Sequence, residues 1–191
     1  MKKNQGYTLI EMLIVIAIMA ILSGVALVTL NVIKEAKCNA AINTFENQIS
    51  ATWIKTKALS QGKIQANPTS SDEKATYPLC LLVKKNTEND DVKDGSYEMI
   101  LGYDNGLGFV EKERLAVLTD IISIKYNSDT SQRHRILTSA AEGDSTDSIL
   151  IQFNKSDGSV KYGAGTYEII YNDRVFGTVY LDEVTGNHYI K

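Results

Sequence analysis

The stretch Gly6-Tyr7-Thr8-Leu9-Ile10-Glu11 leads into an almost uninterrupted apolar run from Met12 to Leu30, and this part of the sequence decides the fold. The run holds about 19 residues, which as a helix extend roughly 28 Å, close to the ~30 Å hydrocarbon core of a bilayer. An ionised carboxylate inside a membrane costs about 3 kcal/mol or more. Glu11, at the head of the run, is therefore the first candidate for a functional residue.

A secretory signal peptide is the main alternative for this stretch, because Lys2 and Lys3 form a basic head. The apolar run is long for such a signal, and no clear small-residue cleavage site follows it before the helical pattern continues. The two lysines favour a cytoplasmic N-terminus, although Lys34 and Lys37 beyond the run weaken the asymmetry. We therefore expect a single-pass membrane anchor with the rest of the chain outside.

The helix is predicted to continue beyond the membrane to about Gln61. From Glu35 onward the apolar residues recur at spacings of three and four, as they do on one face of an amphipathic helix. They are Cys38, Ala41, Ile42, Phe45, Ile49, Trp53 and Ile54. Gly62, directly after Gln61, is a residue type that commonly ends a helix. Residues 7–30 are thus predicted to span the membrane, and residues 31–61 to form the amphipathic continuation.

Residues 62–191 are predicted to form a β-rich globular domain, which makes the chain an α+β protein. Apolar or alternating runs bounded by turn residues indicate strands at Tyr77–Lys84, Tyr97–Tyr103, Ile121–Tyr126, Ile149–Phe153, Tyr167–Tyr171 and Val175–Leu181. Asn154–Gly158 and Asn172-Asp173 are typical of hairpin turns. The segment Glu111–Thr119 is compatible with either a short helix or a strand.

Residues 6–15, with the sequence GYTLIEMLIV, resemble the N-terminus of type IV pilins and type II secretion pseudopilins. The resemblance implies a leader of residues 1–6, cleavage by a prepilin peptidase after Gly6, and N-methylation of Tyr7. It also implies a pilin-like fold, in which a long N-terminal helix packs on an antiparallel sheet and moves from the membrane into a filament. The residue after the glycine is commonly Phe in this family, and Tyr7 is an aromatic residue of similar size.

The chemistry that the resemblance implies for Glu11 is physically sensible. Cleavage would create a charged amine at Tyr7, buried among packed helices as the filament grows. The carboxylate of Glu11 on a neighbouring helix can pair with that amine across a one-step stagger, and such a pair is much stronger in low dielectric than in water. Leaving either charge unpaired is costly. We interpret Glu11 as an assembly residue that checks register, rather than a side chain that snorkels to the interface.

The C-terminal third shows a less specific resemblance to the H-type minor pseudopilins and related minor pilins. The segments concerned are 149–153, 156–159, 167–171, 177–181 and 185–187. The resemblance implies paired β-sheets, and it favours a minor subunit over a major one.

Cys38 and Cys80 are the two cysteines of the chain and allow one intramolecular disulfide. Cys38 lies on the apolar helix stripe, and Cys80 lies within a predicted strand. A bridge would fasten that strand to the helix outside the cytoplasm, where disulfides persist. Two buried thiols are the alternative, and the balance favours the bridge only slightly.

Signatures of enzymes, cofactors and metals are missing from the sequence. The two histidines, His134 and His188, adjoin no persuasive nucleophile, and no phosphate-binding, dinucleotide-binding or metalloprotease motif occurs. Asn154–Gly158 is superficially like a calcium loop but lacks the later bidentate acid. We therefore expect no catalytic residue, no cofactor and no metal site, although the resemblance to pseudopilins, some of which bind calcium, leaves calcium binding as an alternative.

The formal net charge of −3 gives the chain no bulk attraction to nucleic acid, and Lys84-Lys85 and Arg133-His134-Arg135 are only small basic clusters. The sequence thus predicts a filament subunit of a type IV pilus or type II secretion pseudopilus. Its expected partners are other subunits, the prepilin peptidase, the assembly platform and the membrane. Two alternatives remain: a DNA-binding or adhesive tip pilin of a transformation pilus, and an unprocessed anchored domain that binds a ligand.

Overall fold

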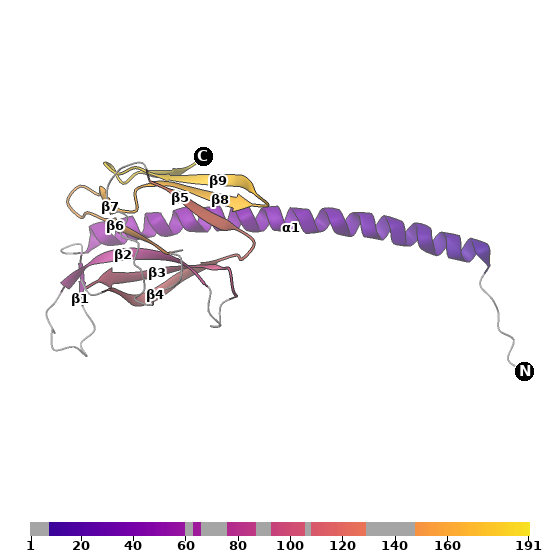
Figure 1. Cartoon of the computed structure of the whole chain (residues 1–191), viewed down its shortest axis with the longest axis horizontal. Helices are drawn as coiled ribbons and strands as arrows, with labels where there is room; N and C mark the ends of the chain where they lie inside the picture. Colours follow the sequence, from indigo (N-terminus) through magenta and orange to yellow (C-terminus); the bar gives the residue numbers. More distant parts are fainter. Residues whose placement is uncertain (1–7, 60–62, 66–75, 87–92, 106–107, 129–147) are drawn as a thin grey trace, which may run out of the picture. The chain divides into compact units, whose positions relative to one another are not determined.

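A computed structural model describes residues 8–59, 63–65, 76–86, 93–105, 108–128 and 148–191. One long helix, α1 (Leu9–Ala58), is followed by antiparallel strands, which is the α+β, pilin-like arrangement that the sequence predicts (Figure 1). The predicted limits of the helix, Tyr7 and Gln61, lie outside the described residues. The chain divides into two compact units, Met1–Lys37 and Cys38–Lys191.

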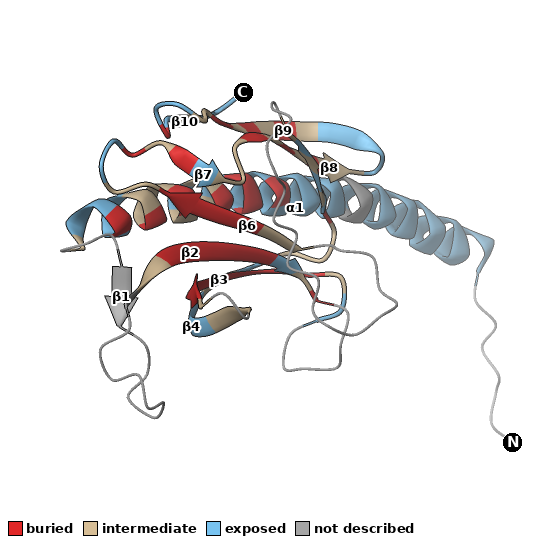
Figure 2. Cartoon of the chain, turned by 60° about the vertical axis from the view of Figure 1, so that its left-hand side comes forward, coloured by how far each residue is buried: buried red, intermediate tan, exposed pale blue. Residues whose placement is uncertain are grey.

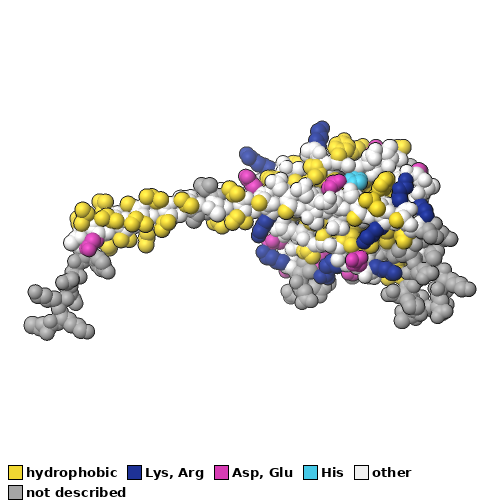
Figure 3. Space-filling view, turned by 180° about the vertical axis from the view of Figure 1, so that it is seen from behind, with side chains coloured by type: hydrophobic (Ala, Val, Ile, Leu, Met, Phe, Trp, Pro, Cys, Tyr) yellow, Lys and Arg dark blue, Asp and Glu magenta, His cyan; other side chains and the backbone are white. Residues whose placement is uncertain are grey.

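In the first unit, hydrophobic side chains cover most of the face of α1 that Figure 3 shows. Leu9, Ile21 and Val32 are each at least 60% exposed. The hydroxyls of Ser23 and Thr29 donate to main-chain carbonyls one turn earlier in the helix, at 2.7 and 2.9 Å, so these polar groups are satisfied without water, as hydrocarbon requires. Among the described residues, α1 is the one helix long and apolar enough to cross a membrane.

In the second unit, the apolar stripe of α1 is confirmed over most of its length. The side chains that are 5% exposed or less are Cys38, Ala41, Ile42, Phe45 and Ile49. The prediction is wrong for Ile54, whose side chain is 59% exposed. Thr52 and Thr56 are buried instead, because they continue the spacing of three and four from Ile49. Their hydroxyls donate to carbonyls four residues earlier, at 2.7 and 2.9 Å.

Six strands form the larger sheet, in the order β4-β3-β2-β6-β7 with β1 paired to β2. They are β1 (Lys63–Gln65), β2 (Thr76–Lys85), β3 (Tyr97–Asp104), β4 (Phe109–Leu118), β6 (Ser148–Phe153) and β7 (Val160–Tyr162). The segment that the sequence leaves open, Glu111–Thr119, falls largely in strand β4. Its charged residues 111–114 are exposed, which suits the last strand of a sheet because charges there discourage pairing with other chains.

Four strands form the smaller sheet, in the order β10-β9-β8-β5. They are β5 (Ser123–Asn127), β8 (Gly165–Tyr171), β9 (Arg174–Leu181) and β10 (His188–Ile190). The predicted turn between β8 and β9 is confirmed: Asn172 and Asp173 have φ of 50° and 59°, as both central residues of a type I′ hairpin require. The predicted turn at Asn154–Gly158 is confirmed too, since the N–H of Asn154 donates to Ser159 O at 2.8 Å.

The core of the second unit lies around the buried face of α1, with one sheet on each side of the helix (Figures 1 and 2). Phe45 of α1 lies 5.1 Å, between ring centroids, from Tyr167 of β8. From the larger sheet, Leu81, Val83 and Ile151 join the same cluster. Helix and sheets therefore share one hydrophobic core, and the burial of the stripe accounts for the helix remaining ordered beyond the apolar run.

Candidate functional site

The first turn of α1 is closed by a reciprocal pair of side chains, Thr8 and Glu11. The N–H and the hydroxyl of Thr8 donate to Glu11 Oε2 at 2.8 and 2.9 Å, and the N–H of Glu11 lies 3.3 Å from Thr8 Oγ1. This is a capping box, in which the residue before the helix and the third helical residue satisfy each other's N–H groups. The signal T-x-x-E before an apolar run is visible in the sequence, and our sequence reasoning missed Thr8.

The cap explains how a carboxylate is tolerated at the head of an apolar helix. Glu11 receives two hydrogen bonds from its own subunit and lies at the positive end of the helix dipole, both of which stabilise the negative charge. A carboxylate offers about four acceptor positions, so the cap is compatible with a further cationic partner. Gly6 and Tyr7, the predicted cleavage and methylation residues, lie outside the described residues.

The structure places Cys38 and Cys80 in different hydrophobic clusters. Cys38 belongs to the core around α1, whereas Cys80 packs with Leu82, Ile100 and Leu150. Side chains alternate between the faces of a strand, so Cys80 points away from the face of β2 that packs on the helix. The two sulfurs are not joined in a disulfide. The slight preference for a bridge is therefore wrong for this structure, and the alternative of two buried thiols describes it.

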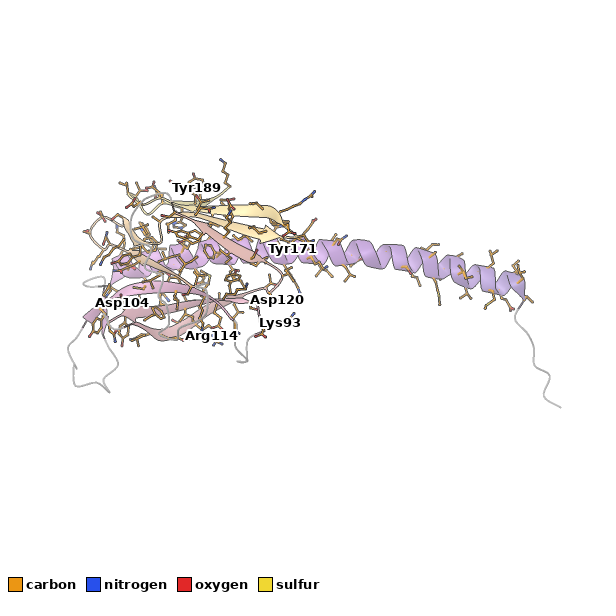
Figure 4. All side chains as sticks on the ribbon, viewed as in Figure 1. Lys93, Asp104, Arg114, Asp120, Tyr171 and Tyr189 are labelled. Carbon is orange, nitrogen blue, oxygen red and sulfur yellow. The ribbon has the colours of Figure 1, made fainter. Side chains whose placement is uncertain are left out.

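Several charged side chains of the second unit form ion pairs with one another. Lys93 Nζ lies 2.5 Å from Asp120 Oδ2 (Figure 4), and its hydrogen bond lowers the pKa of Asp120. Arg114 Nε lies 3.2 Å from Glu98 Oε2 across β3 and β4. Of the predicted basic clusters, Lys84-Lys85 ends strand β2, and Arg133-His134-Arg135 lies outside the described residues. No observation on the described residues therefore favours a nucleic-acid interface.

In the turn at Asn154–Gly158, the carboxylate of Asp157 accepts hydrogen bonds from Ser159, directly after the turn. The hydroxyl and the N–H of Ser159 donate to Asp157 Oδ1 at 2.7 and 2.9 Å, and these hydrogen bonds lower the pKa of Asp157. Among the described residues, no group of three or more His, Cys, Asp or Glu side chains could hold a metal ion. The turn is thus held by its own hydrogen bonds.

Near the C-terminal end of α1, Trp53 lies against two turns that contain Gly158 and Gly186. The indole N–H of Trp53 donates to the carbonyl of Gly158 at 3.1 Å. Gly186, between β9 and β10, lies against the same carbonyl with φ of +67°, and a Cβ placed on it would overlap that oxygen and approach the indole nitrogen to 3.0 Å. Glycine is therefore required at position 186 both by conformation and by space.

We expect Gly186→Ala to lower the free energy of unfolding by about 2–3 kcal/mol, because the alanine is strained at positive φ and displaces a backbone neighbour. Gly108→Ala is the matched control, since nothing lies within 4 Å of its Cβ, and it should change stability by less than about 0.5 kcal/mol. Urea titration followed by the fluorescence of Trp53, the single tryptophan, measures both. Equal effects of the two substitutions would contradict the close packing.

A serine, a histidine and a glutamate from distant parts of the chain also meet. Ser50 Oγ lies 2.5 Å from His188 Nε2, and Glu46 Oε1 lies 3.4 Å from the same nitrogen. In hydrolase triads the acid holds Nδ1 while the serine faces Nε2. Here both groups face Nε2, and Nδ1 faces the carbonyl of Gly186 at 3.1 Å. The arrangement lacks the orientation of a nucleophile–base–acid set.

Comparison with known proteins bears on the N-terminal segment. Residues 1–27 match the family model described as the prokaryotic N-terminal methylation motif. No curated protein and no solved structure matches the chain significantly. The matched segment contains the Thr8–Glu11 cap and most of the exposed apolar part of α1. The chain therefore carries the prepilin-type signal of type IV pilins and pseudopilins, which implies processing by a prepilin peptidase and assembly with other pilin subunits.

Proposed function

We propose that this protein is a non-enzymatic, minor filament subunit of a type IV pilus or a type II secretion pseudopilus. The observation that carries the proposal is the methylation motif over residues 1–27, which includes most of an exposed apolar helix long enough to cross a membrane. In this proposal the subunit waits in the membrane with residues 38–191 outside, and an assembly platform then moves its helix into the filament. The β-rich unit becomes part of the surface of the pilus or pseudopilus.

The role proposed for Glu11 follows from the charges that processing creates. Cleavage after Gly6 leaves an amine at Tyr7, one residue before the Thr8 cap. Within the membrane, the cap of Glu11 on Thr8 (2.8 and 2.9 Å) stabilises the carboxylate of the stored subunit. In the filament, the same carboxylate pairs with the amine of a neighbouring copy, since an unpaired amine among packed helices would be costly.

Three variants separate the charge of Glu11 from its capping role. Glu11→Gln keeps an acceptor for the cap but removes the charge, Glu11→Ala removes both, and Thr8→Ala weakens the cap while keeping the charge. Because an uncompensated buried charge costs about 3–5 kcal/mol, we expect both Glu11 variants to enter sheared filaments at least about tenfold less than the wild type. Thr8→Ala should have the smaller effect.

Cleavage and membrane insertion serve as controls for this experiment. All three variants should begin at Tyr7 after processing and remain in the membrane fraction. The two Glu11 variants remove a charge and so lower the cost of insertion, and Thr8→Ala leaves the charge and the apolar run unchanged. Incorporation of Glu11→Gln at the wild-type level would reject charge pairing. Absence of the wild-type protein itself from sheared filaments would reject the role as a filament subunit.

A further inference from the structure

The last strand of the chain, β10, is held to the second unit by little main-chain pairing. It has three residues, His188–Ile190, and pairs with β9 alone among the described strands. Tyr189 and Ile190 are 52% and 43% exposed, and Tyr189 lies on the outside of the smaller sheet (Figure 4). So short a strand has few ladder hydrogen bonds, although Lys191 and Thr178 exchange two more just beyond it, and the ring of Tyr189 lies 5.3 Å from that of Tyr180, between centroids. One side chain of β10 also reaches the core.

His188 is that side chain. Its ring is largely buried, with 12% of the side chain exposed, and it reaches from β10 to the helix, where Ser50 Oγ lies 2.5 Å from Nε2. Ser50 Oγ in turn lies 3.3 Å from Glu46 Oε1, and Glu46 Oε1 lies 3.4 Å from His188 Nε2. The contact joins residues 138 positions apart.

The positions of the hydrogen atoms in this cluster depend on whether the imidazole of His188 is neutral or protonated. Gly186 O faces Nδ1 at 3.1 Å, and because a carbonyl can only accept, Nδ1 carries hydrogen in either state. When the ring is neutral, Nε2 accepts the single proton of the Ser50 hydroxyl, so that hydroxyl cannot also donate to Glu46. When the ring is protonated, Nε2–H donates to Ser50, whose own proton turns to Glu46. Protonation thus adds one hydrogen bond and an ion pair.

The other charged groups close to this turn include Asp182 and Glu183 in the β9–β10 connection, and Lys57 of α1, whose Nζ lies 3.2 Å from a Cβ placed on Gly158. The hydroxyl and the N–H of Thr185 donate to Asp182 Oδ1 at 2.6 and 2.7 Å and lower the pKa of Asp182. Asp182 therefore stays charged over the range in which imidazoles titrate, about pH 5 to 8. Glu46 on α1 is the carboxylate that pairs directly with His188.

From this geometry we infer that His188, Ser50 and Glu46 form a proton-sensitive latch that fastens strand β10 to helix α1. The latch is tighter when the imidazole is charged and looser when it is neutral. Opening it would leave β9 as an edge strand, with main-chain groups available to another chain. The latch lies wholly within the second unit and is independent of the role proposed for Glu11.

Hydrogen exchange of the C-terminal peptide in the processed, full-length protein in detergent tests the latch. Rates are divided by the intrinsic rates at each pH, so that only local opening is compared. Because an added ion pair and hydrogen bond shift an opening equilibrium modestly, we expect about fivefold stronger protection of the β10 amides at about pH 5.5 than at about pH 8. Peptides from β2 and β3 should not show this difference.

Four variants make the assignment specific. His188→Gln should remove the pH difference. Ser50→Ala, which keeps the ion pair of His188 with Glu46, and Glu46→Gln, which keeps a hydrogen-bonding side chain, should each reduce it. His134→Gln, which alters the other histidine of the chain, should leave it unchanged. Glu46→Gln is mild enough to fold even if His188→Gln destabilises the protein, and a melting curve checks this. Equal protection at both pH values in the wild type, or a pH difference that survives in His188→Gln, would overturn the latch.

Discussion

Phe45→Ala is expected to lower the free energy of unfolding of the second unit by about 3–5 kcal/mol. Phe45 has no exposed surface, and its ring packs 5.1 Å from the ring of Tyr167, between centroids, at the centre of the core that α1 shares with both sheets. Truncation leaves a cavity that the two sheets cannot close without losing their own contacts. The loss is a large share of the stability of a typical domain.

A fragment that begins at Glu35 and contains the whole unit Cys38–Lys191 is suitable for the measurement. Urea unfolding monitored by Trp53 fluorescence gives the difference in free energy. Ile54→Ala is the control on the same helix: its side chain is 59% exposed, so the loss should stay within about 0.5 kcal/mol. A loss for Ile54→Ala as large as that for Phe45→Ala would mean that the buried face of α1 is assigned incorrectly.

The sequence allowed the helix and its two halves to be predicted because their signals are local. A helix formed by residues Met12 to Leu30 has apolar side chains on every side, and the apolar residues from Cys38 to Ile49 repeat with the period of a helix. The error at Ile54 has a physical source. Apolar Ile54 looks like core, and polar Thr52 does not, but Thr52 satisfies its hydroxyl on the carbonyl of Gln48 and can therefore be buried.

The strands were predictable where apolar runs are long, and less so at the edges. Glu111–Thr119 holds residues that also suit a helix, and only its pairing with β3 makes it a strand. Strands β1, β7 and β10 have three residues each, too few to show a period. The predicted strand at Ile121–Tyr126 begins two residues later, at Ser123.

The cysteine pair shows a further limit of sequence reasoning. The strand around Cys80 is apolar on both faces, since Leu81 and Val83 are as buried as Cys80 and Leu82. Alternation alone cannot say which face meets the helix. In the same way, the contact of His188 with Ser50 depends on how the last strand folds back onto α1, and no spacing in the sequence encodes it. The Thr8–Glu11 cap, by contrast, is local and could have been predicted.

The largest expected effect of any substitution is a block of processing by a bulky residue at position 6. Glycine has no Cβ, so a peptidase can approach the backbone of Gly6 closely, and a side chain there would misplace the peptide bond before Tyr7. Because a misplacement of about 1 Å can cost about a hundredfold in rate, we expect Gly6→Leu to leave essentially all of the protein unprocessed, with Lys2 and Lys3 still present. Sequencing of the N-terminus of membrane protein, from cells that contain the peptidase, distinguishes the two forms.

Gly24→Leu is the control, because Gly24 lies within α1 with nothing within 4 Å of a Cβ placed on it, and that variant should begin at Tyr7 like the wild type. The position of the first residue also separates the two interpretations of the segment. A prepilin leader ends at Gly6 and leaves the apolar helix on the mature chain, where Glu11 can act in assembly. A secretory signal would be removed together with the helix, so a wild-type chain that begins beyond Ser23 would leave no anchor and no role for Glu11 in a filament.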